Sequence, residues 1–257
     1  MEISAVVITF NEEKRLEAAL RSLEGVASEI IVVDSLSTDD TLKVARKYTE
    51  RVYERAWTHS ADQKNHADTL ASFPWILSLD ADERLSPALR DELVKLRGHE
   101  PPCTGFSIPR EAYYLGRWIR HSGWRPDRRV RLFRRDRARW EGDDVHERLV
   151  VDGDVEKLRG PIHHFPFETI GEHAARVNKF SSLAAQKLYA GKKKARLLRL
   201  LVLPTLRCLK TYFLKLGLLD GFPGLVIACL DGYGEFLRSA KLRSIWKKGK
   251  HIEPFPY

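Results

Sequence analysis

Two carboxylates stand one residue apart in Asp80-Ala81-Asp82, directly after the apolar run 75–79. Carboxylate oxygens are hard ligands, and two of them at the end of a buried strand can both reach one Mg²⁺ or Mn²⁺ ion. Such an ion would bridge the phosphates of a bound diphosphate. The same residues could also form an acidic turn in solvent, so the pattern predicts a metal site only in combination with its neighbours.

Further acid–base candidates follow later in the chain. The run Asp144-Val145-His146-Glu147 offers two carboxylates that could take a proton from an attacking hydroxyl as general base, with an acidic surface loop as the alternative. One histidine of the pair His163-His164 could be a third metal ligand or could donate to a phosphate. A histidine packed among aromatic side chains is its alternative.

Arginine and tryptophan alternate between residues 117 and 135. An arginine fork binds phosphate through two hydrogen bonds, and a tryptophan face stacks on sugars or bases. RNA is the rival ligand, but no nucleic-acid-binding motif accompanies the stretch, so we expect no nucleic-acid partner. The residues expected to contact a phosphorylated acceptor are Trp124, Arg128, Arg131 and Arg134.

The order of elements predicts how these groups are positioned. Apolar runs at 3–9, 29–34, 52–55 and 75–79 indicate buried strands, and they alternate with helical patterns at 11–24, 41–48, 62–70 and 87–96. This alternation predicts an α/β fold with a parallel sheet, in which ligands bind beyond the carboxyl ends of the strands. Polar residues follow three of these strands, so we expect them to converge on one rim.

The chain has neither a G-x-G-x-x-G motif nor a P-loop. A nucleotide would therefore be held by side chains at the strand ends and by a metal. After residue 101 the pattern changes to strands at 104–109 and 129–133, and from residue 170 it becomes helical, at 170–188, 195–215 and 225–244. We expect a nucleotide-binding half at 1–100, an acceptor-binding and catalytic half at 101–169, and a helical region at 170–257.

Charge is unevenly distributed over the 257 residues. The formal net charge is +9, but residues 110–139 carry +8 and residues 186–215 carry +9, whereas residues 1–109 carry −6. This distribution argues against a uniformly basic nucleic-acid coat. No secretory signal or membrane-spanning run is visible, and three scattered cysteines indicate free thiols.

The second basic stretch, taken from residue 187 to 215 and followed by the apolar residues 216–237, is also amphipathic, with leucines between its cationic residues. Such a helix is suited to lie in the interface of an anionic membrane surface. A helical subdomain packed on the core, or an oligomer interface, is the alternative, and the oligomeric state is left open.

Taken together, these residues resemble glycosyltransferase family 2, the inverting enzymes with the GT-A fold. Within this family the chain is most similar to the lipopolysaccharide core β-1,4-glucosyltransferases, and the similarity covers nearly its whole length. The segments that carry the broad resemblance are Val6-Val7-Ile8-Thr9-Phe10-Asn11-Glu12-Glu13, Ile31-Val32-Val33-Asp34-Ser35 with Ser37-Thr38-Asp39, and Leu79-Asp80-Ala81-Asp82-Glu83. The narrower segments are Gly123-Trp124-Arg125-Pro126-Asp127, Arg131-Leu132-Phe133-Arg134-Arg135, Val145-His146-Glu147, His164-Phe165-Pro166-Phe167 and Gly217-Leu218-Leu219-Asp220-Gly221 with Gly224.

The resemblance implies a GT-A fold, a mixed and mostly parallel sheet with helices on both faces, and a C-terminal helical extension that associates with a membrane. It also implies residue roles: Glu147 as general base, with Asp144 as the second candidate, and Asp82, Asp80 and His164 at the metal. The residues implied to bind the nucleotide sugar are Thr9, Asn11, Glu12, Asp34, Ser35, Lys64, Asn65 and Asp80. Ser35 stands where many members carry a second Asp.

The resemblance further implies transfer of glucose from UDP-glucose to the phosphorylated heptose inner core of lipopolysaccharide, in a metal-dependent single displacement. The protein would be cytoplasmic and peripheral on the inner face of the inner membrane. The alternatives are a family member with another donor or acceptor, such as a capsule, lipid-linked or protein glycan, and a non-catalytic membrane- or RNA-binding module.

Overall fold

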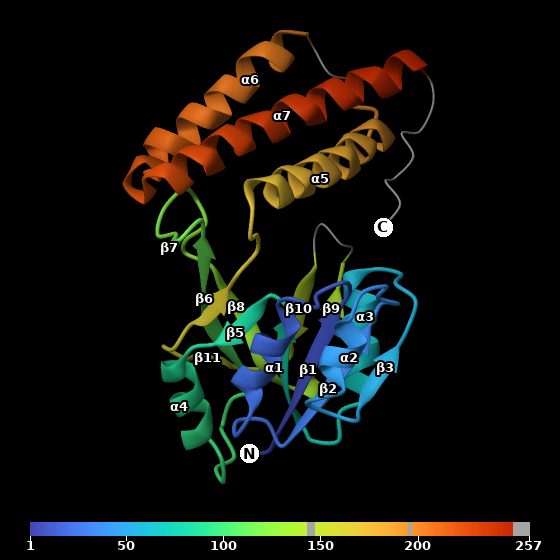
Figure 1. Ribbon diagram of the computed structural model, residues 1–257, viewed down its shortest axis with the longest axis vertical. Helices are drawn as coiled ribbons and strands as arrows, with labels where there is room; N and C mark the ends of the chain where they lie inside the picture. The colour runs from blue at the N-terminus through green and yellow to red at the C-terminus, as the bar shows by residue number, and fades with distance from the viewer. Residues whose placement is uncertain (143–146, 195–196, 249–257) are drawn as a thin grey trace. The chain divides into compact units, whose positions relative to one another are not determined.

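The computed structural model describes residues 1–142, 147–194 and 197–248. The chain forms two compact units (Figure 1). The first comprises Met1–Glu111 and Pro126–His164, and the second comprises Ala112–Arg125 and Phe165–Tyr257.

The first unit is built around a mixed sheet. Four parallel strands lie in the order β3-β2-β1-β4, and antiparallel β8 and β6 continue from β4. Their bounds are β1 (Ile3–Thr9), β2 (Glu29–Asp34), β3 (Val52–Glu54), β4 (Trp75–Asp80), β6 (Gly105–Tyr114) and β8 (Arg128–Arg134).

Short strands complete the sheet. Two of them, β12 (Ile162–His164) and β5 (Glu83–Leu85), pair with each other beyond β6, while β11 (Val155–Lys157) and β7 (Arg117–Trp118) pair with β6 itself. A separate hairpin is formed by β9 (Ala138–Glu141) and β10 (Arg148–Val151).

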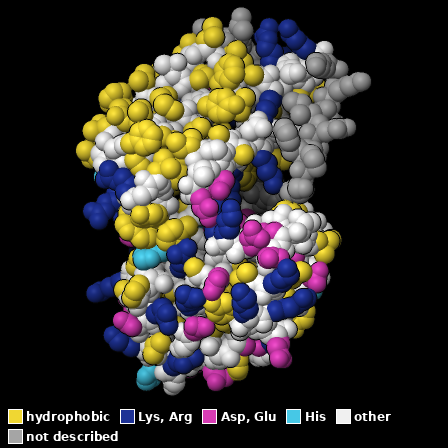
Figure 2. Space-filling view, viewed as in Figure 1, with side chains coloured by type: hydrophobic (Ala, Val, Ile, Leu, Met, Phe, Trp, Pro, Cys, Tyr) yellow, Lys and Arg dark blue, Asp and Glu magenta, His cyan; other side chains and the backbone are white. Residues whose placement is uncertain are grey.

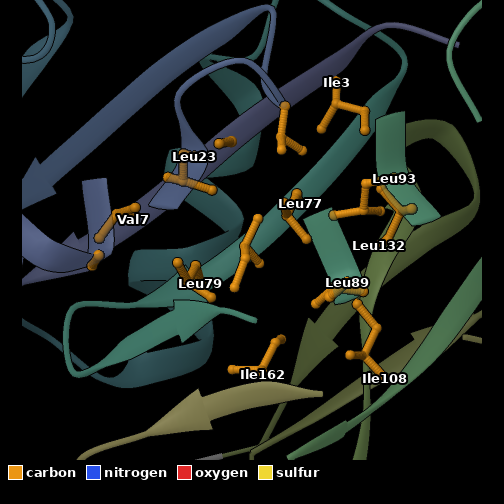
Figure 3. Close-up of a cluster of buried hydrophobic side chains, with 14 of the residues drawn as sticks. Ile3, Val7, Leu23, Leu77, Leu79, Leu89, Leu93, Ile108, Leu132 and Ile162 are labelled. Atoms are coloured by element: carbon orange, nitrogen blue, oxygen red, sulfur yellow. The ribbon is translucent and has the colours of Figure 1, made fainter. Parts of the chain in front are cut away.

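Alternate side chains of the central strands fill two cores, one on each face of the sheet, because successive residues of a strand point to opposite sides. On one face, Ile3 and Val7 of β1 and Leu77 of β4 pack with Leu23 and Leu89 (Figure 3). Those two leucines belong to α1 (Leu16–Leu23) and α4 (Pro87–Lys95), and α2 (Thr41–Ala45) contributes to the same core.

The other face is covered by α3 (Ser60–Thr69). Val6 of β1 and Ile76 of β4 pack there with Ala61 and Ala67 of the helix. The side chain of His59 caps this helix by accepting a hydrogen bond from the backbone N–H of Asp62. Helices therefore cover both faces, which confirms the expected mixed, mostly parallel α/β class.

The second unit is mainly helical. Both α5 and α6 pack against α7, and a short irregular corner joins α6 to α7. Its elements are α5 (Ile170–Ala190), α6 (Leu197–Leu209), the π-helical turn η2 (Lys210–Leu214), the 3₁₀ turn η3 (Gly217–Asp220) and α7 (Phe222–Lys248). None of the helices within the described ranges is long and apolar enough to cross a membrane.

Gly232 permits the close packing of α6 on α7, since an added Cβ would lie 2.8 Å from the carbonyl oxygen of Pro204. Asp220 is buried and ties the corner to residues 120–122. Its carboxylate accepts hydrogen bonds from the backbone N–H groups of Arg120 and His121 and from Oγ of Ser122. The C-terminal region is thus helical, as expected.

Candidate active site

The parallel register brings three strand ends to one edge of the sheet. Thr9 of β1 pairs with Asp34 of β2, and Ile8 pairs with Asp80 of β4. The polar residues after these strands therefore lie at one rim, which confirms their predicted convergence.

Loops after β1 and β2 form one wall of this rim. Asn11 takes a left-handed backbone conformation (φ 52°), which asparagine tolerates better than most residues. Its Oδ1 accepts from the N–H of Thr38 at 2.8 Å, and its own N–H donates to Oγ of Ser37 at 2.8 Å. Ser37 in turn donates to the buried carboxylate of Asp34 at 2.5 Å. The N–H of Glu12 is bound by Thr41, so both loops are held together.

Two hydroxyl groups lie at the same place. Thr9 is buried, and its Oγ1 has no hydrogen-bond partner among the described residues. The Oγ of Ser35 accepts from the side-chain amide of Gln63 at 3.1 Å, and its N–H donates to the carbonyl of Thr9. Buried polar atoms are normally bonded, so Thr9 Oγ1 is an open position for a ligand atom.

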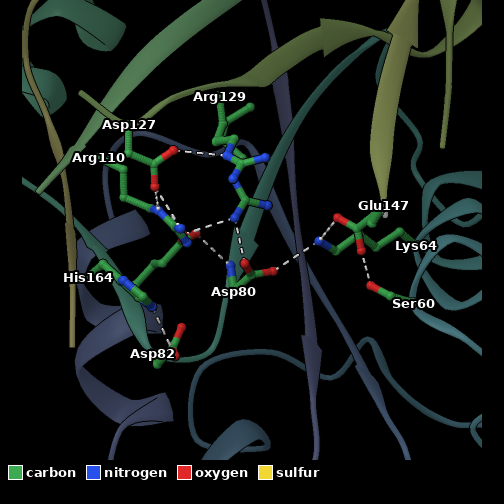
Figure 4. A network of polar contacts seen from close by, with 11 residues as sticks. Ser60, Lys64, Asp80, Asp82, Arg110, Asp127, Arg129, Glu147 and His164 are labelled. Carbon is green, nitrogen blue, oxygen red and sulfur yellow. Dashed lines mark hydrogen bonds and ion pairs between the residues drawn. The ribbon is translucent and has the colours of Figure 1, made fainter. Parts of the chain in front are cut away.

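Asp80 lies between two cations at the end of β4 (Figure 4). Its carboxylate is 3.2 Å from Nζ of Lys64 and 2.5 Å from Nη2 of Arg131. Burial alone would raise the pKa of Asp80, but the charges of Arg131 and Lys64 outweigh it and hold the pKa well below its usual range. Asp80 is therefore ionised.

Behind Asp80 lies a fully buried glutamate. Glu83 accepts from Arg131 at 2.9 Å, from Arg110 at 3.1 Å and from the backbone N–H of Asp80 at 3.0 Å. Asp127 in turn binds Arg110 at 2.7 Å. A buried carboxylate is tolerated only when it is paired in this way, so the network fixes the end of β4.

Asp82 points away from these cations, toward His164 (Figure 4). His164 Nε2 is 3.3 Å from Asp82 Oδ2, because β12 pairs with β5 so that His164 faces Glu83. No group of three or more His, Cys, Asp or Glu side chains arranged to hold a metal occurs in the described part of the chain. Mg²⁺ is commonly held by one or two carboxylates together with substrate phosphates and water, so the Asp82 carboxylate suits such an ion, and His164 is the neighbouring nitrogen donor.

Glu147 is held by two residues of α3 (Figure 4). Its carboxylate is 2.7 Å from Nζ of Lys64 and accepts a hydrogen bond from Oγ of Ser60. Lys64 thus bridges Glu147 and Asp80, two groups that the sequence separates by 67 positions. Asp144, the second base candidate, lies outside the described residues.

The same helix also holds Trp140, at the strand that precedes Glu147. The side-chain amide of Asn65 donates to the carbonyl of Trp140 at 2.9 Å and accepts from its N–H at 3.0 Å. Asp68 accepts from the indole N–H at 3.0 Å, and Lys64 Nζ lies 4.5 Å from the ring centroid. Burial raises the pKa of Asp68 to about 7, against the opposing effects of the Trp140 hydrogen bond and of Lys64.

The three arginines expected at the acceptor are not gathered at one place in the first unit. Arg131 is buried against Asp80, whereas Arg134 faces Trp75 at the other end of β4 and binds Asp136. Arg128 donates to the carbonyls of Ser107 and Leu158. Trp124 belongs to the second unit, where its ring packs near Tyr114 and Phe167.

Sequence reasoning missed several site residues, namely Ser60, Gln63, Asp68, Glu83, Arg110 and Trp140. A signal for three of them was present: α3 reads SADQKNHADT, yet it covers a sheet face. A helix with so few large apolar residues can pack there only by burying polar side chains, which then need partners.

Residues 4–149 match the family model described as Glycosyl transferase family 2. The lipopolysaccharide core biosynthesis glycosyltransferase LpsC of Rhizobium meliloti (strain 1021) is 33% identical over 249 residues, which cover 94% of this chain and 92% of that protein. An uncharacterized glycosyltransferase of Rickettsia bellii is 30% identical, with 95% of this chain and 87% of that protein covered. The crystal structure of S. aureus TarS 1–349 has a TM-score of 0.48 at 16% identity, covering 98% of this chain and 93% of that chain.

Proposed function

The chain belongs to glycosyltransferase family 2 and has the GT-A fold, and from this membership we propose that it transfers a sugar from a nucleoside diphosphate donor to the lipopolysaccharide core. The observation that carries the proposed chemistry is the juxtaposition of Glu147 with Lys64 and Asp80 at the carboxyl ends of the parallel strands. A carboxylate, an ammonium group and a second carboxylate thereby lie where such sheets bind ligands.

The proposed reaction is a single displacement with inversion. The acceptor hydroxyl oxygen forms a bond to the anomeric carbon, the bond from that carbon to the diphosphate oxygen breaks, and Glu147 takes the hydroxyl proton. Ser60 and Lys64 orient the Glu147 carboxylate for this transfer. The nucleoside diphosphate is the leaving group.

The donor would lie against the wall formed by the loops after β1 and β2. Thr9, Asn11, Glu12, Asp34 and Ser35 form this wall, and Lys64 supplies a cation beside Asp80. Arg131 is bonded to both Asp80 and Glu83, so we assign it the support of the Asp80 carboxylate. Both the nitrogen and the oxygen of the Asn65 side-chain amide bond the backbone of Trp140, so we propose that Asn65 positions Trp140.

Asp82 and His164 would hold Mg²⁺ or Mn²⁺, which when bound neutralises charge that builds on the departing diphosphate. The pair offers one oxygen and one nitrogen ligand, and both side chains are mostly buried. The ionised Asp80 carboxylate is already paired with Lys64 and Arg131, so we propose that it lies near the metal without being one of its ligands.

UDP-glucose is the proposed donor and the phosphorylated heptose region of the core the proposed acceptor, on the family resemblance and on the similarity to LpsC. Arg128 and Trp124 remain proposed acceptor contacts. The same similarity supports a cytoplasmic location, peripheral on the inner face of the inner membrane.

A donor panel tests this function directly. Purified protein is incubated with UDP-glucose, UDP-galactose, GDP-mannose or an ADP-heptose, with and without Mn²⁺, and with a truncated core that ends in heptose. We expect metal-dependent release of UDP from UDP-glucose and a mass gain of one hexose on the core. Transfer from another donor, or to another glycan only, would replace the proposed donor or acceptor. Absence of turnover with every donor would overturn the proposal.

A further inference from the structure

Large apolar side chains are exposed over the corner that joins α6 to α7. Eleven of the twenty exposed large apolar residues among the described positions fall between residues 201 and 225. The most exposed are Leu214 (78%), Leu201 (66%) and Phe222 (64%), followed by Leu206, Phe213 and Leu219. Figure 2 shows these apolar side chains gathered over α6 and the beginning of α7. A contiguous apolar surface of this kind marks an interaction site.

The backbone of the corner contributes to this exposure. The chain leaves α6 through the π-helical turn η2 and re-enters α7 after the 3₁₀ turn η3. Leu216 between them adopts a left-handed conformation (φ 56°), which a leucine rarely takes. The turn is held from inside by Asp220 and by Thr211, which is fully buried and donates to Asp231. The exposed leucines therefore project from a backbone that buried hydrogen bonds hold in place.

Cations accompany the apolar surface. Lys210 is exposed on the π-helical turn, and Arg117 donates to the carbonyl of Leu219 at 3.4 Å. Lys215 lies against the loop at Gly123. Between residues 197 and 225 the sequence has one acidic residue, Asp220, and its carboxylate is buried. Asp231 of α7 lies beside this surface, is 30% exposed and pairs with Arg207 at 3.4 Å, so the surface combines apolar groups with a surplus of positive charge.

The surplus of positive charge indicates which kind of partner binds this apolar surface. A symmetric contact between two copies would bring the same surplus of cations face to face, and the nearby carboxylate of Asp231 is already paired with Arg207. An anionic lipid surface offers phosphates to the cations and acyl chains to the leucines. We propose that residues 201–225, which comprise the corner, most of α6 and the first residues of α7, form the membrane-docking element of this chain. Leu214, Phe213 and Phe222 enter the headgroup region of an anionic bilayer.

This inference refines the proposed location and does not depend on the proposed reaction. It places the membrane contact at residues 201–225, whereas the sequence pattern predicted a contact along the whole amphipathic stretch 187–237. The Lys192-Lys193-Lys194 run is exposed and adds positive charge in the same unit.

Vesicle sedimentation tests the proposal. Wild-type protein is mixed with phosphatidylcholine vesicles and with vesicles in which about a third of the lipid is phosphatidylglycerol. We expect binding to the anionic vesicles that salt weakens, and little binding to the neutral ones. The double change Leu214→Glu with Phe222→Glu removes two exposed apolar groups that would be buried in the bilayer, each worth about tenfold or more in partitioning, and should abolish sedimentation. Lys210→Ala should weaken binding about fivefold.

Val94→Glu is the control, because it also places a negative charge on an exposed apolar residue (46%), here on α4 of the first unit. It should bind vesicles as the wild type does. UDP release from the donor, measured without vesicles, should be unchanged in the double variant, which separates this test from the test of the reaction. The proposal would be overturned if the wild-type protein did not sediment with anionic vesicles, or if the double variant bound them as well as the wild type does. So would a dimer in solution that the double change converts to monomer without loss of vesicle binding.

Discussion

The buried carboxyl of Asp68 predicts how the stability of the first unit depends on pH. Burial raises its pKa from 3.8 to about 7, although Trp140, Lys64 and Arg135 act in the opposite direction. One of its oxygens accepts from the Trp140 indole, and the other, Oδ1, is buried without a hydrogen-bond partner among the described residues. The folded protein therefore holds the proton more tightly than the unfolded chain.

The sign follows from this difference in proton affinity. As the pH rises from about 4 to about 7, the unfolded chain loses its proton first, so the free energy of unfolding falls; above pH 7 the loss is complete. Each tenfold step in proton affinity is about 1.4 kcal/mol, so a rise from 3.8 to about 7 amounts to about 4 kcal/mol at most. Asp68→Asn has no charge to bury and still accepts the indole hydrogen bond.

Urea unfolding of both proteins, followed by circular dichroism between pH 5 and pH 8, measures the effect. We expect the stability of the Asn variant relative to the wild type to increase by about 2.7 kcal/mol between pH 5 and pH 8, because the unfolded carboxyl is already ionised at pH 5 and part of the loss, about 1.6 kcal/mol, has occurred by then. Carboxylates with a lowered pKa, such as Asp62 and Asp127, are present in both proteins, so their contribution cancels in the difference. A difference that stays constant with pH would refute the reasoning.

Three further predictions concern the site. Glu147→Gln should lower kcat by about 10²–10⁴-fold and leave UDP binding near the wild-type value; full activity would place the base elsewhere, with Asp144 next to be tested. Asp82→Asn should raise the Mn²⁺ concentration needed for half-maximal UDP release by about tenfold or more, whereas the exposed Asp136→Asn should not; equal metal dependence in both would contradict the assigned ligand. Asn65→Ala removes two hydrogen bonds to Trp140 and should lower the free energy of unfolding by about 2 kcal/mol. It should also lower kcat. An unchanged kcat would mean that α3 does not position Glu147.

The central strands could be predicted closely from the sequence. Residues 3–9 and 29–34 are apolar runs that end in polar residues, and β1 and β2 have those bounds. The strands β5, β7 and β12 have two or three residues, too few to show a periodicity, and were not predicted; the equally short β3 was predicted because it lies in the alternation of strands and helices. The helix expected at 195–215 ends as α6 at Leu209, where the chain passes into a π-helical turn.

The rim of the site was predictable because parallel strands align their ends, and Asp80 and Asp34 lie there. The partners of these residues were not predictable. Eleven arginines between residues 110 and 139 look alike in sequence, and only pairing of β8 with β4 directs Arg131 to Asp80. Glu83 and Arg110 lie far apart in the chain, and their contact depends on tertiary packing.

The division of the chain has a practical consequence for dissecting this enzyme. The polypeptide crosses between the units three times, after Glu111, Arg125 and His164. A truncation at residue 164 would leave Tyr114 and Trp124 without the Phe167 and His173 rings that they pack against. The α/β unit cannot be isolated by one stop codon, and a minimal version would need residues 112–125 replaced by a short linker.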